Sequence, residues 1–136
     1  MDQAAAKILI LGGLGSLLFS FTMAFVLAQE RTKDPEADYA RLLQVHVVSL
    51  WEGFMLLGLV WAVALSDLST GLETVAALLL VAAAALQFSA TVMAWRNKVT
   101  NLFAPPRGLM YQLAATNAVL AMAGLLILIV GALKGL

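Results

Sequence analysis

Residues 42–66 read LLQVHVVSLWEGFMLLGLVWAVALS, and Glu52 is the only side chain in this stretch that is charged when histidine is neutral. A helix needs about 20 mostly apolar residues to cross the hydrocarbon core of a bilayer, which is roughly 30 Å thick. The stretch is long enough, and it lacks the regular alternation of polar and apolar residues that membrane strands show. It therefore predicts a transmembrane helix.

The same character returns in three further stretches, at residues 8–28, 74–95 and 108–133. Hydrophobic residues make up 62% of the sequence, whereas soluble domains contain about 45–50%. We predict an all-α membrane protein with a single membrane domain over residues 1–136. Short connections make consecutive helices antiparallel neighbours, so an up-down bundle is expected. Its four transmembrane helices are predicted at approximately residues 7–29, 40–66, 72–96 and 107–133.

Positive charges are divided unequally between the two ends of the predicted helices. The end with both termini has only Lys7 and Lys134. The first and third connections hold the remaining cations, which are Arg31, Lys33, Arg41, Arg96, Lys98 and Arg107. Because loops rich in lysine and arginine stay in the cytoplasm, we predict that these two connections are cytoplasmic and the termini outside. We expect an integral protein of a bacterial inner membrane.

Charge and cysteine content exclude several classes of function. The formal net charge is zero, which gives no electrostatic basis for binding nucleic acid. There are no cysteines, so disulfides and thiolate metal sites are absent. Four short spans enclose little volume, and glycines such as Gly12 and Gly13 favour close approach of helices in lipid. We therefore predict a homo-oligomer in the lipid bilayer, with its sites inside the bundle or between subunits.

Polar side chains gather in one half of the predicted membrane region. Measured from the cationic ends of their helices at 1.5 Å per residue, His46 lies roughly 7 Å deep and Glu52 roughly 16 Å deep. By the same measure Gln87 and Asn117 lie about 13 and 15 Å deep, and Ser20 about 13 Å deep. The opposite half is nearly featureless. We predict a polar chamber that opens from the cationic face and ends near the midplane.

Glu52 and His46 are the most informative members of this set. A carboxylate near the bilayer centre costs at least a few kcal/mol, which indicates a functional site. His46, the only histidine, allows three interpretations: a helix-to-helix hydrogen bond, a proton relay with Glu52, or a metal ligand. Glu52 lies six residues on, roughly 240° around the helix, so the two cannot share a zinc ion.

Haem needs only one protein histidine, because the porphyrin supplies four nitrogens. Gly53, seven residues from His46 on the same helical face, leaves room for a flat macrocycle. Four cationic side chains lie at a suitable level to pair with the haem propionates, namely Arg41, Arg96, Lys98 and Arg107. With one histidine per chain, a bis-histidine haem within one subunit is impossible, so one axial position is open or taken by another group.

Residues 40–56, ARLLQVHVVSLWEGFML, resemble the signature of the styrene oxide isomerase family, small four-span membrane proteins that bind haem b. In that family a histidine is followed six residues later by asparagine and then glycine. The same spacing appears here as His46, Glu52 and Gly53. Residues 86–109, LQFSATVMAWRNKVTNLFAPPRGL, also resemble the family's pattern, which ends in phenylalanine, proline and Arg-Gly-Leu. The resemblance covers about half of the chain.

The resemblance implies a trimer with haem b between adjacent subunits and His46 as its axial ligand. It also implies a small hydrophobic substrate, an aryl epoxide, whose oxygen is polarised by ferric haem acting as a Lewis acid. Ring opening to a benzylic cation and a 1,2-shift then give an aryl acetaldehyde, without net electron transfer.

The chain departs from the family at three polar positions of the pocket. Glu52 stands in place of an asparagine, Gln87 in place of an aspartate and Trp95 in place of a tyrosine. Together with Asn117, these residues are predicted to line the substrate pocket. Three other functions stay open: a haem-binding sensor or redox module without isomerase activity, a non-haem interaction subunit of a membrane complex, and a proton-coupled transporter.

Overall fold

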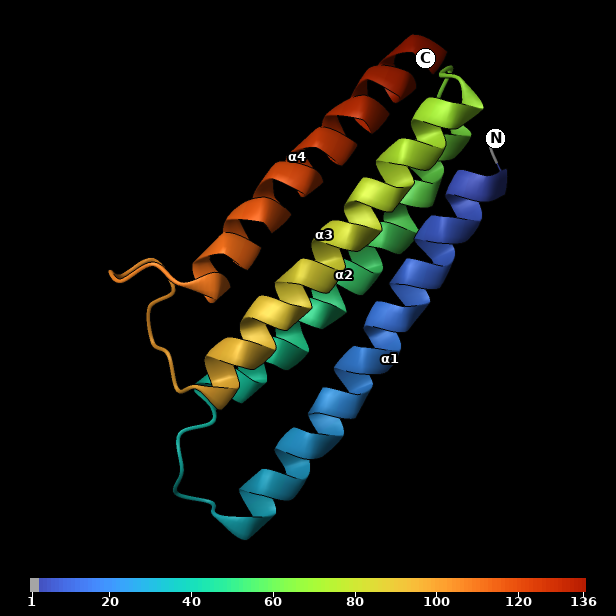
Figure 1. The fold of residues 1–136 in the computed structure, drawn as a ribbon. Coiled ribbons are helices and arrows are strands. Elements are labelled where there is room, and N and C mark those ends of the chain that lie inside the picture. Colours follow the sequence, from blue (N-terminus) through green and yellow to red (C-terminus); the bar gives the residue numbers. More distant parts are fainter. Residues whose placement is uncertain (1–2) are drawn as a thin grey trace.

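The computed structural model describes residues 3–136 and has four helices in that range, each long and apolar enough to span a membrane (Figure 1). They are α1 (Gln3–Lys33), α2 (Ala40–Ala64), α3 (Thr70–Arg96) and α4 (Leu109–Gly135). The predicted all-α fold of four helices is confirmed, and the length and apolarity of these helices fit an integral membrane protein. The largest difference is in α1, which extends past its predicted bounds at both ends. Alanines at residues 4–6 favour its start. The helix ends at Lys33, because helical backbone is disfavoured at the residue before Pro35.

The four helices do not form a closed square. Consecutive helices run antiparallel, and α2 and α3 lie between α1 and α4 (Figure 1). The most extensive packing is between α1 and α2 and between α3 and α4. Within the described residues no Cα atom of α1 lies within 8 Å of a Cα atom of α4. One long side of each outer helix therefore has no partner in the single chain.

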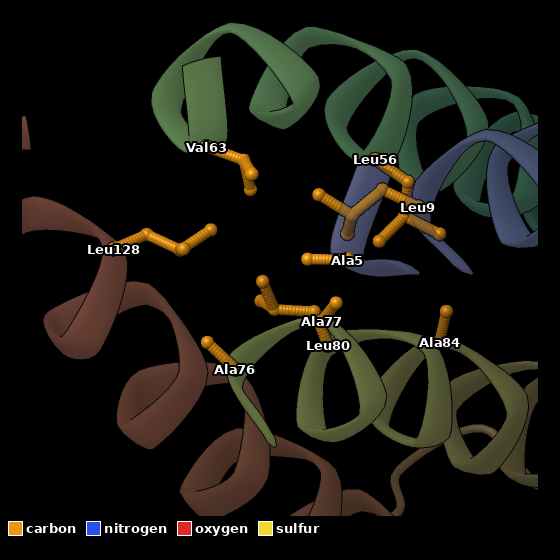
Figure 2. Close-up of a cluster of buried hydrophobic side chains, with 9 residues drawn as sticks. All are labelled: Ala5, Leu9, Leu56, Val63, Ala76, Ala77, Leu80, Ala84 and Leu128. Carbon is orange, nitrogen blue, oxygen red and sulfur yellow. The ribbon is translucent and has the colours of Figure 1, made fainter. Parts of the chain in front are cut away.

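Two groups of buried side chains hold the helices together at different depths. The first draws on all four helices (Figure 2). Its members are Ala5, Leu9, Leu56, Val63, Ala76, Ala77, Leu80, Ala84 and Leu128. The second, at the cationic end, is built on Met23, Leu27, Leu42 and Val45, and α4 takes no part in it. The buried residues of α4 all lie in its second half, from Gly124 onward, so its first half stands beside a three-helix core.

Gly13 and Gly53 allow the closest approach of α1 and α2. A Cβ atom added at Gly53 would lie 2.7 Å from Leu17 Cδ2 and 3.1 Å from the Gly13 carbonyl oxygen. A Cβ atom at Gly13 would lie 3.0 Å from the Gly53 carbonyl oxygen. Small residues at such crossings let helix backbones pack directly against each other in lipid.

Replacing Gly53 with leucine is therefore expected to lower the free energy of unfolding by about 1–3 kcal/mol, because the new side chain overpacks the crossing. Gly58→Leu is the matched control on the same helix, since a Cβ atom there meets nothing within 4 Å. Unfolding in increasing sodium dodecyl sulfate, followed by far-UV circular dichroism, measures both. Equal losses in the two variants would contradict the close crossing.

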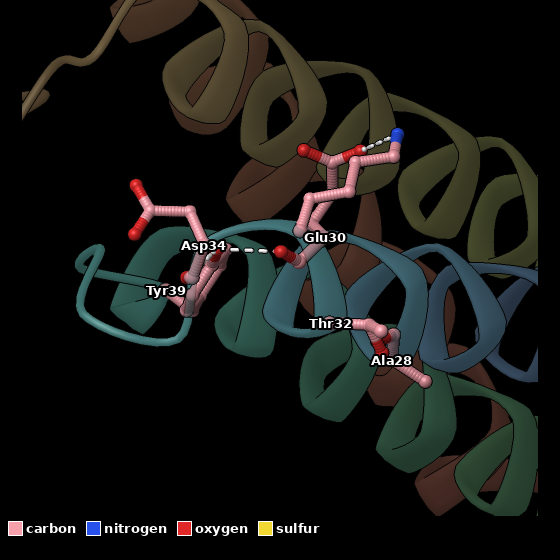
Figure 3. A network of polar contacts seen from close by, with 6 residues as sticks. Ala28, Glu30, Thr32, Asp34 and Tyr39 are labelled. Atoms are coloured by element: carbon pink, nitrogen blue, oxygen red, sulfur yellow. Dashed lines mark hydrogen bonds and ion pairs between the residues drawn. The ribbon is translucent and has the colours of Figure 1, made fainter.

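Tyr39 fastens the connection between α1 and α2 (Figure 3). Its hydroxyl donates to the carbonyl oxygen of Glu30 at 2.7 Å and also lies against the carbonyl oxygen of Asp34. Partial burial of the phenol, and then the charges of Asp34 and Glu30, raise the pKa of Tyr39 above its ordinary value. The phenol therefore stays protonated and keeps its donor role to a higher pH than a free tyrosine.

This hydrogen bond sets a pH window for the connection. Because the pKa of Tyr39 is raised in the folded chain, its contribution is complete below about pH 10 and is lost as the pH rises through the folded-state value. In a Tyr111→Phe variant, which leaves Tyr39 as the only tyrosine, ultraviolet absorbance is expected to report ionisation above about pH 10. Ionisation at or below that pH would show that the hydroxyl is not held.

Candidate functional site

His46 lies on the face of α2 that packs against α1. Its Nδ1 atom is 2.9 Å from the hydroxyl oxygen of Ser20 and 2.9 Å from the carbonyl oxygen of the same residue. The Ser20 hydroxyl, which is fully buried, donates to the carbonyl oxygen of His46 at 2.9 Å. The Ser49 hydroxyl also donates to that carbonyl, at 3.0 Å. The imidazole ring is thus fixed to α1 through one nitrogen.

These contacts determine which ring nitrogen carries the hydrogen. A carbonyl oxygen only accepts, and the single hydroxyl hydrogen of Ser20 is donated to His46, so Nδ1 must be the donor. The lone pair of the neutral ring is then on Nε2. No described residue hydrogen-bonds to Nε2, whereas every buried side-chain nitrogen and oxygen in residues 3–136 has a partner. Nε2 therefore reaches the surface of the single chain.

This arrangement is the one that metal-binding histidines use. The ring nitrogen opposite the metal usually donates to a backbone carbonyl or a carboxylate, which fixes the tautomer and makes the ligating nitrogen more basic. Ser20 had been placed only as one of several polar residues at membrane depth. Spacing contains a signal for the contact, because Gly13 and Ser20 on α1, like His46 and Gly53 on α2, are seven residues apart. Two such pairs match when the helices run antiparallel.

The structure corrects the prediction for Gly53. We expected this glycine to leave room for a macrocycle beside His46. Instead α1 fills the space, since Leu17 and the backbone of Gly13 lie directly against Gly53. Its role in the single chain is to let the two helices approach. In doing so it holds α1 in the register that brings Ser20 to His46.

Glu52 lies in the middle of α2 and is half-buried. Within the part of the chain that the structure describes, its carboxyl group has neither a hydrogen bond nor an ion pair, and no buried polar atom there lacks a partner. The carboxyl group therefore also reaches the surface of the single chain. Its neighbour Trp51 is 71% exposed, so this part of the α2 surface is uncovered in the single chain.

Gln87 and Asn117, both predicted pocket residues, are brought together. The Asn117 side-chain amide donates to Gln87 Oε1 at 2.6 Å, which joins α3 to the first half of α4. This hydrogen bond uses one polar atom of each side-chain amide, and it forms without a substrate. The polar residues of the expected chamber thus form two separate groups in the single chain, Ser20 with His46 between α1 and α2, and Gln87 with Asn117 between α3 and α4.

The three arginines that were predicted to pair with haem propionates have different surroundings. Arg41 reaches the α3–α4 connection, where it donates to the Thr100 carbonyl oxygen, and it also donates to Gln44 Oε1 at 2.7 Å. Arg107 lies over the ring of Tyr111, 5.0 Å from its centroid. Arg96 is exposed at the last turn of α3. No described contact links any of these arginines to His46.

Trp95 packs against the buried cluster at the cationic end and lines a cavity there with Arg41 and Lys98. Neither His46 nor Glu52 lines this cavity. Trp95 lies in the last turn of α3, and tryptophan is enriched at such ends of membrane-spanning helices.

No family model matches the chain, and the comparisons with curated proteins and with solved structures likewise give no match. The resemblance to the styrene oxide isomerases through residues 40–56 and 86–109 therefore stays a prediction. Among residues 3–136 there is also no group of three histidine or acidic side chains that could hold a metal ion. A metal bound at His46 needs a cofactor or another subunit to supply its remaining ligands.

Proposed function

We propose that the protein binds haem b in the membrane, with Nε2 of His46 as an axial ligand. The observation that carries the proposal is the 2.9 Å contact of Nδ1 with the Ser20 carbonyl oxygen. This contact assigns the ring hydrogen to Nδ1, and Nε2 is left unpaired at the surface. A porphyrin brings four nitrogens of its own, so a single histidine is a sufficient donor set. The absence of other ligands around His46 in the described range fits this cofactor better than a bare ion.

The proposed activity is conversion of an aryl epoxide to an aldehyde, as the family resemblance implies. Ferric haem, when bound, supplies the Lewis acidity that polarises the epoxide oxygen. The chain supplies a site in the apolar layer of the membrane, which admits a hydrophobic substrate and excludes water. Glu52, with a carboxyl group that has no partner in the described chain, orients the substrate by hydrogen bonding.

The proposal includes a homo-oligomer, a trimer by the resemblance, in a bacterial inner membrane with the first and third connections in the cytoplasm. Two polar groups support the oligomer. The Nε2 atom of His46 and the carboxyl group of Glu52 both reach the surface of a helix that is long and apolar enough to span a membrane. Polar groups at that depth are costly unless they find a partner, and a neighbouring subunit with its cofactor supplies one.

A second candidate is a haem-binding module without isomerase activity. The pairing of Gln87 with Asn117 at 2.6 Å favours it, because two of the predicted pocket residues then bind each other. An isomerase requires that these side chains exchange partners when the substrate enters. A sensor or redox module requires no such exchange.

The test is an absorption spectrum of the detergent-purified protein, oxidised and reduced, after expression with added haem. A Soret band together with aldehyde formation from an aryl epoxide would support the isomerase. A Soret band without turnover of several aryl epoxides would favour the module. A colourless protein that stays colourless when titrated with haem would overturn both and leave a non-haem interaction subunit.

A further inference from the structure

A cavity of about 430 Å³ lies at the cationic end of the bundle, between the start of α2 and the end of α3. Arg41 and Lys98 contribute the cationic side chains of its lining, and Trp95 contributes an indole ring. Arg41 contacts the α3–α4 connection, whereas His46 packs against α1. The cavity is therefore distinct from the proposed haem ligand.

The two cations of the cavity have no acidic partner. The guanidinium of Arg41 donates only to neutral oxygens, those of the Gln44 side chain and the Thr100 backbone. The side-chain ammonium of Lys98 has neither a hydrogen bond nor an ion pair with any described residue, and the one ion pair in residues 3–136 joins Lys33 to Glu30. An anion in this cavity would meet two cations that form no ion pair within residues 3–136.

One acid, Asp38, also lines the cavity. Its Oδ1 atom accepts a hydrogen bond from the backbone N–H of Ala40 at 2.9 Å, at the first residue of α2. The carboxylate is thus occupied in part by the start of that helix. Two cations and one acid leave the cavity with a net positive charge.

The backbone of Lys98 gives a second, independent reason to assign the cation a role. Helix α3 ends in a Schellman motif: the Lys98 N–H donates to the Trp95 carbonyl at 3.2 Å and the Val99 N–H donates to the Ala94 carbonyl at 3.0 Å. The left-handed residue of this motif is usually glycine. Here Lys98 occupies it with a φ of 54°. An unfavourable conformation that places a cation in a cavity points to a function for that charge.

We propose that this cavity binds the phosphate headgroup of an anionic membrane lipid. Trp95 lies at the end of a span, at the level where aromatic side chains meet lipid headgroups. Basic pockets between transmembrane helices are known sites for anionic headgroups. The phosphate lies between the guanidinium of Arg41 and the ammonium of Lys98. The site does not depend on haem binding at His46.

Trp95 makes the proposal directly measurable. In a Trp51→Phe/Trp61→Phe background, Trp95 is the only tryptophan. The full chain is reconstituted in phosphatidylcholine vesicles that contain a fixed share of brominated phosphatidylglycerol or, in parallel, brominated phosphatidylcholine. Quenching of Trp95 is expected to be at least about twofold stronger with the anionic lipid, because the net positive charge of the cavity concentrates this lipid beside the indole.

Lys98→Gly removes the cation while suiting the left-handed backbone, so this variant should unfold at the same temperature as the parent or higher. It is expected to abolish the preference for the anionic lipid, as is Arg41→Gln. Lys33→Gln is the matched control, because Lys33 lies on the same side of the membrane, outside the cavity and paired with Glu30. It should retain the preference.

Three outcomes would overturn the proposal. Equal quenching by the two lipids would show that the cavity has no preference. An equal loss in Lys33→Gln and Lys98→Gly would assign the effect to general surface charge. Relief of the preference by millimolar inorganic phosphate would identify free phosphate as the ligand. Persistence of the preference in His46→Ala, where the proposed haem ligand is absent, would support the lipid site and separate it from the proposed function.

Discussion

Replacement of His46 by alanine is expected to abolish the Soret band that haem produces with the parent protein. The chain has no other histidine and no cysteine to take over as axial ligand. Loss of a partner of a metal ligand alone typically weakens metal binding 10–100-fold, so loss of the ligand itself should exceed about 100-fold. Haem titration of the detergent-purified variants, followed at the Soret wavelength, measures the change.

Ser20→Ala refines the experiment because it leaves the imidazole in place. The hydroxyl that links the ring to the His46 backbone is lost, while the Ser20 carbonyl can still accept from Nδ1. We expect haem affinity to fall by about tenfold, at the low end of the range for such partners. Ser16→Ala is the matched control, since Ser16 is buried on the same helix but bonds only to the Gly12 carbonyl at 2.8 Å. An equal loss of haem affinity in Ser20→Ala and Ser16→Ala would show that Ser20 acts only through packing.

The number of membrane helices and their approximate bounds could be predicted from the sequence, because they depend on the length and polarity of each segment. The contact of Ser20 with His46 could not be predicted in the same way. It depends on how far α1 slides and rotates against α2, and therefore on the crossing at Gly13 and Gly53. Counting depth from helix ends placed Ser20 deeper than His46, since it assumed level ends. In the structure α1 continues to Lys33.

Depth was more informative for Gln87 and Asn117. The sequence placed them at about 13 and 15 Å from the cationic face, which is close enough for a contact, and the structure pairs them. Their role in a pocket stays a prediction, because the depth of a side chain does not determine which neighbour its amide hydrogen-bonds to. For Gly53 the same limit applied: a missing side chain can admit a cofactor or a helix, and here it admits α1.

Glu52→Leu is expected to change insertion and function in opposite directions. On insertion scales an acid at the helix centre costs about 2.5–3.5 kcal/mol and leucine is slightly favourable. The substitution should therefore ease membrane insertion of α2 by about 3 kcal/mol, measured by glycosylation mapping of the segment in microsomes. If Glu52 orients the substrate at the haem, aldehyde formation should fall by about 100-fold or more, the range for a positioned acid or base group, while the Soret band is retained.

Glu52→Gln separates the charge of the side chain from its ability to hydrogen-bond. A glutamine keeps an acceptor and a donor at the same position, so substrate orientation by hydrogen bonding predicts partial activity in this variant, between that of the parent and that of Glu52→Leu. If Glu52 instead binds a helix of another subunit, both variants should dissociate the oligomer in detergent, visible as a smaller particle in light scattering, and the Soret band would weaken with it. If Glu52→Leu inserts more readily, keeps the oligomer and loses the reaction, only a functional role of the acid explains the result. Removal of a residue that serves stability would destabilise the protein, whereas removal of a residue that serves function can stabilise it.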